Sequence, residues 1–135
     1  MTGMTAAAAR WLLCGALICL ALTVGVVALG WLPAAKPDSE LVLVARDMTF
    51  FRDGQFDTPN PPLQFTAGTR VRLVLRNEDP GMTHNFAIPA WSVATRDLDH
   101  GDKAQIEFVV PGGPSHPAYE CTPHARLMHG PIEIR

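Results

Sequence analysis

Eight residues from Thr69 to Arg76, TRVRLVLR, set the pattern of this chain. Apolar residues recur there at every second position, at Val71, Leu73 and Leu75. Arginines occupy the alternate face, at Arg70, Arg72 and Arg76. A period of two predicts a β-strand with one buried face and one solvated face. The arginine face is then either solvated or a docking surface for an acidic partner.

The same period continues on either side of this strand. Residues 103–110 repeat it, and shorter candidate strands are residues 41–45, 63–65, 84–88, 118–121 and 132–134. Turn formers such as Asp53-Gly54 and Asp79-Pro80-Gly81 separate the candidates, and the 12 prolines leave no room for a long helix. Residues 90–97 predict a turn or two of helix. Together these features predict an all-β domain, an antiparallel sandwich or small barrel of about 7–8 strands.

Composition and charge divide the chain into two parts. With 135 residues, 47% of them hydrophobic, and a net charge of −2, there is room for one domain, and neither a disordered tail nor a nucleic-acid binder is indicated. Residues 1–35 are strongly apolar and are predicted to be an N-terminal transmembrane anchor or a signal segment. Residues 36–40 form a polar linker, and residues 41–135 form the domain.

The apolar leader has the length of a membrane-spanning helix. No charged residue occurs from Trp11 to Leu32, and about 20 apolar residues suffice to cross a bilayer. Arg10 precedes this segment, which places the N-terminus in the cytoplasm and the domain outside. We therefore expect a single-pass protein of the cell membrane with its domain on the periplasmic or extracellular side. Cleavage near Gly30 and secretion to the periplasm is the alternative.

The three cysteines divide in the same way. Cys14 and Cys19 lie in the leader, where they are expected to be apolar filler, and Cys121 stands alone in the domain. A single cysteine cannot form a disulfide within its own domain. Cys121 is therefore expected to be a buried thiol, a nucleophile, a metal ligand or one half of an intermolecular bridge.

Metal-binding side chains gather around that cysteine. The segment from Cys121 to Gly130 reads CTPHARLMHG, so a thiol, the imidazole of His124 and the thioether of Met128 follow within eight residues. A second imidazole, His84, follows the turn at residues 79–81. Two histidines and one cysteine with a distant axial methionine form the ligand set of copper sites for electron transfer. Zinc could take the same cysteine and histidines, but methionine is a poor zinc ligand.

Residues 40–135 resemble the cupredoxins, the blue copper proteins. The resemblance is carried by four motifs, His84-Asn85, Tyr119-x-Cys121, Cys121-x-Pro123-His124 and Met128-x-Gly130-x-Ile132. It implies a Greek-key β-sandwich or barrel that holds one type 1 copper. It also implies that His84, Cys121 and His124 are the equatorial ligands and Met128 the axial one. Asn85 would tie the two ligand loops together.

The spacing of the ligand loop leaves an alternative for the axial position. Three residues separate His124 from Met128, one more than in amicyanin and one fewer than in plastocyanin. His129 is adjacent to Met128 and is the substitute to be tested.

The resemblance implies a one-electron carrier rather than an enzyme. Such a carrier would pass electrons through His124 to a transiently docked redox partner such as a cytochrome or an oxidase. The five histidines include no His-x-His pair, which the catalytic copper sites of oxidases and reductases would require.

Two other functions remain open from the sequence. One is a cupredoxin subunit of a membrane oxidase without the dinuclear copper centre, because Ala125 and Ile132 stand where that centre needs a second cysteine and a methionine. The other is periplasmic copper handling, although the domain has no methionine-rich or histidine-rich tract.

Overall fold

The structure is a computed structural model that describes residues 36–113 and 116–135. Within these ranges no helix is long and apolar enough to span a membrane. The anchor predicted between Trp11 and Leu32 lies outside the described residues.

The regular secondary structure of the described residues is almost entirely β-strand. Its elements, in chain order, are β1 (Ser39–Arg46), β2 (Thr49–Arg52), β3 (Leu63–Phe65), β4 (Arg70–Asn77), β5 (Ala87–Ile88), the 3₁₀ helix η1 (Pro89–Trp91), β6 (Val93–Ala94), β7 (Lys103–Val109), β8 (Ala118–Glu120), the 3₁₀ helix η2 (Thr122–His124) and β9 (His129–Ile134). The all-β prediction is confirmed. β1 begins at Ser39, inside the segment predicted to be a linker.

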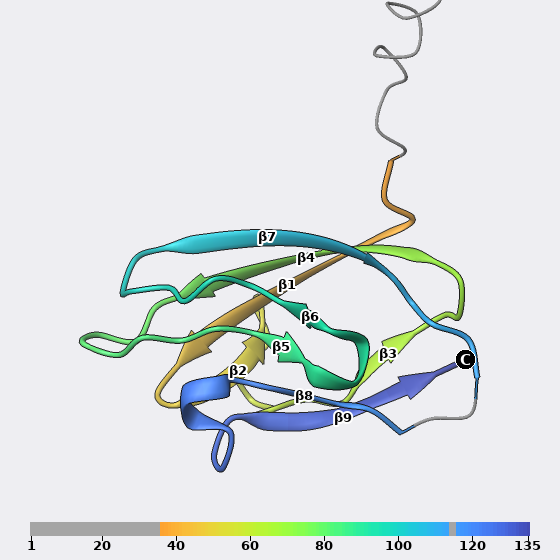
Figure 1. Cartoon of the computed structure of the whole chain (residues 1–135). Coiled ribbons are helices and arrows are strands. Elements are labelled where there is room, and N and C mark those ends of the chain that lie inside the picture. Colours follow the sequence, from red (N-terminus) through yellow and green to blue (C-terminus); the bar gives the residue numbers. More distant parts are fainter. Residues whose placement is uncertain (1–35, 114–115) are drawn as a thin grey trace, which may run out of the picture. The chain divides into compact units, whose positions relative to one another are not determined.

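The strands form two sheets that face each other (Figure 1). One has the order β2-β1-β4-β7 and the other the order β3-β9-β8-β5-β6. The predicted antiparallel pairing holds for most neighbouring strands, but β1 runs parallel to β4 and β3 runs parallel to β9. The chain passes from the first sheet to the second at β3 and returns to the first at β4. Because of this crossing, β4 pairs with β1 in the same direction. β1 starts at the end of the sandwich opposite the η2 loop (Figure 1).

The alternating segment of residues 69–76 forms β4. Its residues are by turns half-buried and buried along the whole strand. It pairs with β1 on one side and with β7 on the other, so it lies inside its sheet. Of the turn or two of helix predicted for residues 90–97, only the single turn η1 forms. It ends at Trp91, and Ser92, with a left-handed φ of 53°, caps it and directs the chain into β6. This length is typical of a 3₁₀ helix, because its hydrogen-bond geometry is poor and longer runs are uncommon.

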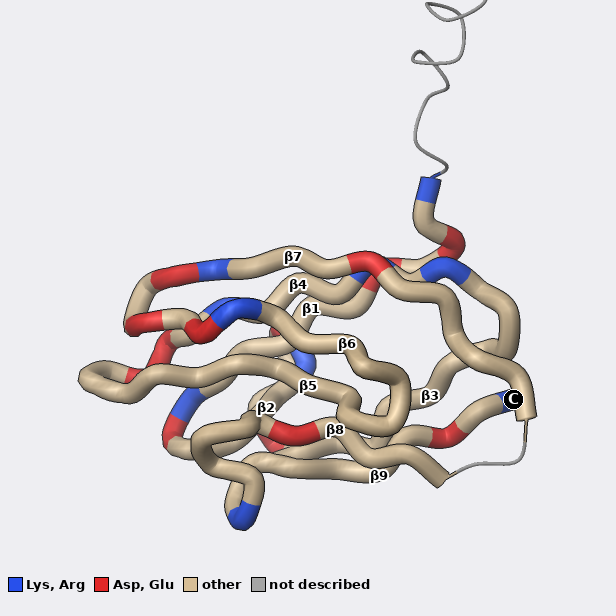
Figure 2. The backbone as a smooth tube through the Cα atoms, in the orientation of Figure 1, with Lys and Arg blue, Asp and Glu red and all other residues tan. Residues whose placement is uncertain are grey.

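Two of the three arginines on the face of β4 pair with acidic residues of the same chain. Arg72 lies 3.0 Å from the Glu107 carboxylate, and Arg76 lies 2.7 Å from that of Asp53 and 3.2 Å from that of Glu78. Figure 2 shows acidic and basic residues interspersed over these strands. Because their charge is already balanced, these two arginines offer little attraction to an acidic partner.

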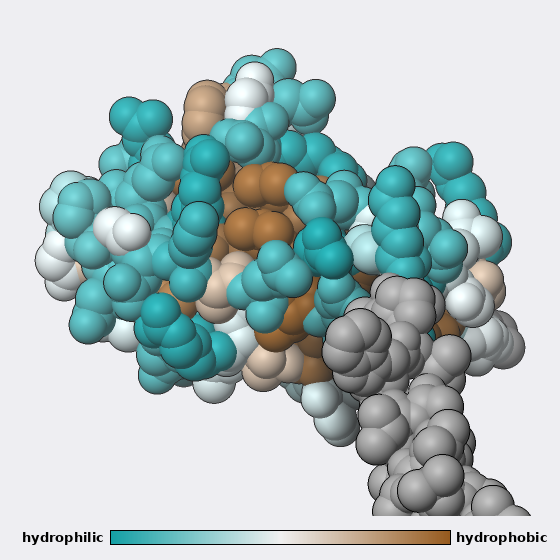
Figure 3. All heavy atoms as spheres, turned by 90° about the horizontal axis from the view of Figure 1, so that it is seen from above, coloured by the Kyte–Doolittle hydropathy of each residue, from teal (hydrophilic) through white to brown (hydrophobic). Residues whose placement is uncertain are grey.

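The core lies between the two sheets. Its centre is an aromatic group of Phe50, Phe86 and Tyr119, with ring centroids 5.5–6.0 Å apart. All three rings are fully buried. Seen from the side on which β7 lies (Figure 3), hydrophobic side chains gather in the middle of the face and hydrophilic side chains border them. The aromatic group belongs to the same core cluster as the predicted ligands Cys121 and Met128.

Candidate metal centre

The strand period places two of the predicted ligands directly above the aromatic core. His84 precedes Phe86 by two residues, and Cys121 follows Tyr119 by two. Side chains two apart on an extended chain share a face, so both ligands point inward with their aromatic neighbours. His84 is held in this extended geometry by paired backbone hydrogen bonds with Leu98, of 3.0 and 2.8 Å. His84 and Cys121 are both fully buried.

The third ligand comes from the loop between β8 and β9. His124 ends the short helix η2, and its backbone amide donates to the Cys121 carbonyl. The loop closes on itself, because the Met128 amide donates to the His124 carbonyl and the Cys121 amide donates to the Met128 carbonyl. Cys121, His124 and Met128 are therefore fixed to one another by backbone hydrogen bonds of 2.9–3.0 Å.

Three donor atoms converge at the centre of this arrangement. Cys121 Sγ lies 3.6 Å from Nδ1 of His84 and 3.6 Å from Nδ1 of His124, and the two nitrogens are 3.2 Å apart. A point equidistant from these three atoms is about 2.0 Å from each, close to metal–imidazole and metal–thiolate bond lengths. One transition-metal ion fits between them.

Hydrogen bonds among the three side chains cannot explain why Cys121 Sγ and the two Nδ1 atoms lie so close together. Nε2 of His84 lies 3.1 Å from Oδ2 of Asp79, so in the neutral ring that nitrogen carries the proton and Nδ1 presents a bare lone pair. Only the Cys121 thiol and the His124 ring can then donate a proton. Two hydrogen bonds at most can form, which is too few for three close contacts. A cation satisfies all three lone pairs at once, so the donor set has the chemistry of a metal site.

Burial also decides between the two candidates for the axial position. Met128 is completely buried and belongs to the same core cluster as Cys121. His129 is exposed at the first position of β9, where it pairs with Glu120 on β8. The structure therefore favours Met128, whose soft thioether completes a set of two imidazoles, one thiolate and one thioether.

Asn85 links the two ligand segments, as the resemblance implied. Its side-chain oxygen accepts a 2.7 Å hydrogen bond from the Thr122 amide, immediately after Cys121. Its side-chain nitrogen donates to Asp97 at 2.9 Å. The segment that carries His84 is thereby tied to the loop that carries the other three ligands.

Two groups that support His84 were missed by sequence reasoning. Asp79 was interpreted only as a turn former, yet its Oδ2 lies 3.1 Å from Nε2 of His84 and accepts a 2.8 Å hydrogen bond from the Met48 amide. Asn77 is buried, and its side chain donates to the carbonyls of Met82 and Leu98 and accepts from the Asp79 amide. Both residues also have partners far away in sequence, Leu98 for Asn77 and Met48 for Asp79, and no local pattern marks those contacts.

A third missed residue supports the other ligand loop. Asn60 was interpreted as a strand breaker, but its side chain bridges Phe50 on β2 and the loop before Met128. Its oxygen accepts from the Phe50 amide at 3.1 Å, and its nitrogen donates to the Leu127 carbonyl at 2.9 Å. Its left-handed backbone, with φ of 45°, is tolerated better by asparagine than by most residues.

The environment of the thiol and of its neighbours changes their acidity. Burial raises the pKa of Cys121, and the backbone amides of Asn85 and His124 offset part of that effect. For Asp79, burial alone would raise the pKa, but the Met48 amide and His84 outweigh it and lower the pKa. A thiol with a raised pKa is protonated at neutral pH until a metal ion displaces its proton.

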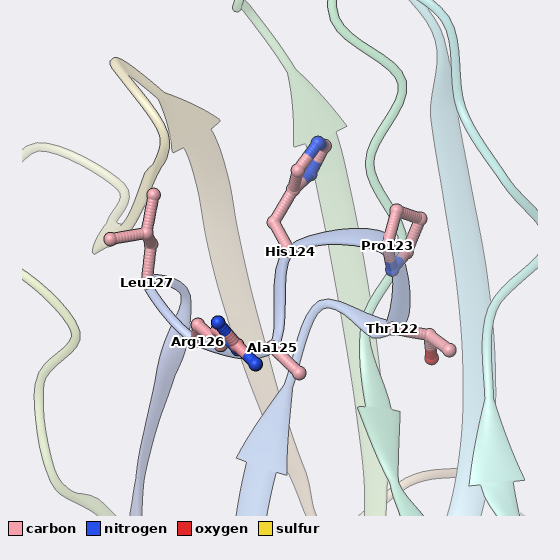
Figure 4. Close-up of a pocket in the computed structure, with 6 residues that line it drawn as sticks. All are labelled: Thr122, Pro123, His124, Ala125, Arg126 and Leu127. Atoms are coloured by element: carbon pink, nitrogen blue, oxygen red, sulfur yellow. The ribbon is translucent and has the colours of Figure 1, made fainter.

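Only one of the four ligands reaches the surface. His84, Cys121 and Met128 are completely buried, whereas His124 is partly exposed. Figure 4 shows the ring of His124 in the loop between the side chains of Pro123 and Leu127. Leu127 is 61% exposed, and these loop residues line a shallow surface hollow.

Comparisons with known proteins identify the fold. No protein-family model matches the sequence, and no curated protein matches it either. Among solved structures, auracyanin B is similar, with 21% identity and a TM-score of 0.58 over 76% of this chain and 93% of the other. Rusticyanin from Thiobacillus ferrooxidans has 20% identity and a TM-score of 0.58 over 74% and 79%.

A subunit of a larger enzyme has the same fold. The periplasmic domain of subunit II of cytochrome oxidase from Bradyrhizobium japonicum shows 15% identity and a TM-score of 0.55, over 76% of this chain and 88% of the other. The domain therefore has the cupredoxin fold. Its ligand set of His84, Cys121, His124 and Met128 fits a single type 1 copper.

Proposed function

We propose that this protein is a one-electron carrier that holds a single type 1 copper on the outer face of a membrane. The observation that carries the proposal is the asymmetric burial of its ligands. The thiol of Cys121 is sealed from water, and the His124 ring is partly exposed. Copper bound by these ligands supplies reversible one-electron redox chemistry.

The chain's own residues make that exchange fast and selective. Backbone hydrogen bonds among Cys121, His124 and Met128 hold the donors in place, so a change of metal charge requires little movement of the protein. Burial of Cys121 excludes water and exogenous ligands, which prevents side reactions of the thiolate. Around His124, the exposed apolar residue Leu127 suits a small and short-lived docking contact.

Colour tests the copper site. The purified full-length protein loaded with Cu(II) is expected to show an intense visible thiolate-to-copper band, which disappears in Cys121→Ser. Cys14→Ser and Cys19→Ser are matched controls, because they make the same change in the leader, and both should keep the band. A wild-type protein that binds copper without colour would contradict the carrier proposal and favour copper handling.

The carrier role needs a second measurement. The coloured protein should be reduced and reoxidised repeatedly without loss of copper, and it should exchange electrons with a small soluble cytochrome within milliseconds to seconds. Release of the metal on reduction would contradict the proposal, since a carrier must hold copper in both oxidation states.

The location is supported by the sequence alone. The uncharged segment from Trp11 to Leu32 follows Arg10, and this arrangement favours an anchor with the domain outside. The full-length protein should remain in the membrane fraction after alkaline washing, and added protease should reach the domain from the outer side. A mature protein that begins near Trp31 and is freely soluble would show a cleaved signal instead.

A subunit of a membrane oxidase is the second candidate. The likeness to the periplasmic domain of an oxidase subunit favours it. Cys121 is the single cysteine of the described residues, and position 125 is alanine, so the domain offers one thiolate to a metal centre. Metal analysis should find one copper per chain. Two coppers per chain, or co-purification in a stable complex with haem proteins, would favour the oxidase interpretation.

A further inference from the structure

The strongest unassigned feature near the site is the carboxylate behind His84. Asp79 is 7% exposed, and its Oδ2 lies 3.1 Å from the ring nitrogen that faces away from the metal position. The other ring nitrogen, Nδ1, is the one that converges with Cys121 and His124. Asp79, His84 and the metal position therefore form a carboxylate–histidine–metal line.

Asp79 is held in that position by two further parts of the fold. Its amide donates to the side chain of Asn77 at 2.9 Å, and Asn77 also binds the loop carbonyls of Met82 and Leu98. The same carboxylate oxygen that faces His84 accepts a 2.8 Å hydrogen bond from the Met48 amide. The carboxylate is thus aimed at the ring from a fixed frame.

The turn that presents the Met48 amide is strained. Asp47 and Met48 connect β1 to β2, and both have left-handed backbones, with φ of 50° and 56°. Two successive positive φ values suit a tight hairpin turn, but the side chain of methionine makes this region unfavourable for it. The contact between the Met48 amide and Asp79 offsets part of that cost.

We propose that Asp79 is a positioning residue that fixes the orientation of His84 and adjusts the reduction potential of the site. This inference rests on the proposed copper function and adds the residue that regulates it. By accepting a hydrogen bond from the Nε2–H group, the carboxylate keeps the Nδ1 lone pair directed at the metal. Its negative charge favours Cu(II) over Cu(I), since the more highly charged ion gains more from a nearby anion.

Two substitutions separate orientation from charge. Asp79→Asn keeps an oxygen that can accept from His84 and removes the charge. We expect it to retain the visible band and to lower the ratio of Cu(II) to Cu(I) affinity by about tenfold, which raises the reduction potential by about 59 mV. Asp79→Ala removes the acceptor, and we expect about a 10- to 100-fold loss of copper affinity.

Asp99→Asn is the matched control for the charge. Asp99 is exposed and accepts a 2.8 Å hydrogen bond from Thr83, beside His84 in sequence, without contact to the His84 ring. The same loss of one negative charge at this solvated position should change the potential much less. Equal shifts for Asp79→Asn and Asp99→Asn would overturn the proposal, because the effect would then be general electrostatics.

A measurement on the metal-free protein tests orientation independently. In nitrogen NMR of the full-length apoprotein, His84 should carry its proton on Nε2, and Asp79→Ala should abolish this preference. The same tautomer in wild type and Asp79→Ala would overturn the positioning role. A colourless wild-type protein would instead defeat the proposed function, so the two failures are distinguishable.

Discussion

Tyr119 lies with its ring directly against Gly130, its partner across strands β8 and β9. A Cβ atom added to Gly130 would be only 2.6 Å from Cε1 of the ring. The ring is fully buried and packs against both Phe50 and Phe86, which restricts its movement away from Gly130. Two motifs that the sequence shows separately, one before Cys121 and one after Met128, are therefore halves of one contact.

Gly130→Ala is expected to destabilise the domain by about 1–3 kcal/mol, because the new methyl group overlaps a ring whose movement is restricted. Denaturant unfolding of the metal-free protein measures this change. Gly112→Ala is the control: no atom lies within 4 Å of its added Cβ, and stability should be unchanged. Equal stability of both variants would show that the sheet can open at Tyr119 without cost.

Tyr119→Phe is expected to cost about 1–3 kcal/mol, although it removes a single oxygen. That hydroxyl donates a 2.8 Å hydrogen bond to the carbonyl of Pro61 in the buried interior. Its loss leaves the carbonyl without this partner. The free energy of unfolding measures the effect, and a value equal to wild type would mean that the carbonyl finds another donor.

Met128→Leu is expected to keep the visible band and to raise the reduction potential, because a hydrocarbon offers no lone pair to the oxidised ion. His129→Ala should leave both the spectrum and the potential unchanged, since His129 is exposed on β9. Voltammetry and absorption of the two copper-loaded variants decide the matter. A larger spectral change in His129→Ala would assign the axial position to His129.

Asn60→Asp is expected to disturb the ligand loop while keeping the acceptor for the Phe50 amide. The aspartate cannot donate to the Leu127 carbonyl, so the residue before Met128 loses its restraint. Electron paramagnetic resonance of the copper-loaded variant should show a broadened or altered signal. Thr58→Val in the same exposed loop is the control, and matching spectra from both variants would remove Asn60 from the site's support.

The sequence predicted those parts of the molecule that depend on near neighbours. β4 and β7 alternate over their whole length, so their pattern alone was sufficient. β2 has four residues with the adjacent aromatics Phe50 and Phe51 in its middle, and this breaks the period of two. β6 has two residues, too few to show any period. Both strands were missed for that reason.

In the metal site, likewise, residues close together in sequence were predicted, and contacts between distant residues were missed. Cys121, His124 and Met128 share one short loop, so their spacing predicted them together. The hydrogen bond from Asn60 to Leu127 joins residues 67 apart in sequence, and that from Met48 to Asp79 joins residues 31 apart. Such contacts form because the chain crosses from one sheet to the other. The spacing of residues along the sequence does not show where it crosses.

The position of β1 has a practical consequence. Because this strand begins at the end of the sandwich opposite the η2 loop, a linkage made just before Ser39 lies far from the His124 ring. Coupling the domain through that point to an electrode, a bead or a fused reporter keeps the end that carries His124 turned outward. Attachment before Ser39 would therefore orient every immobilised copy of the domain in the same way.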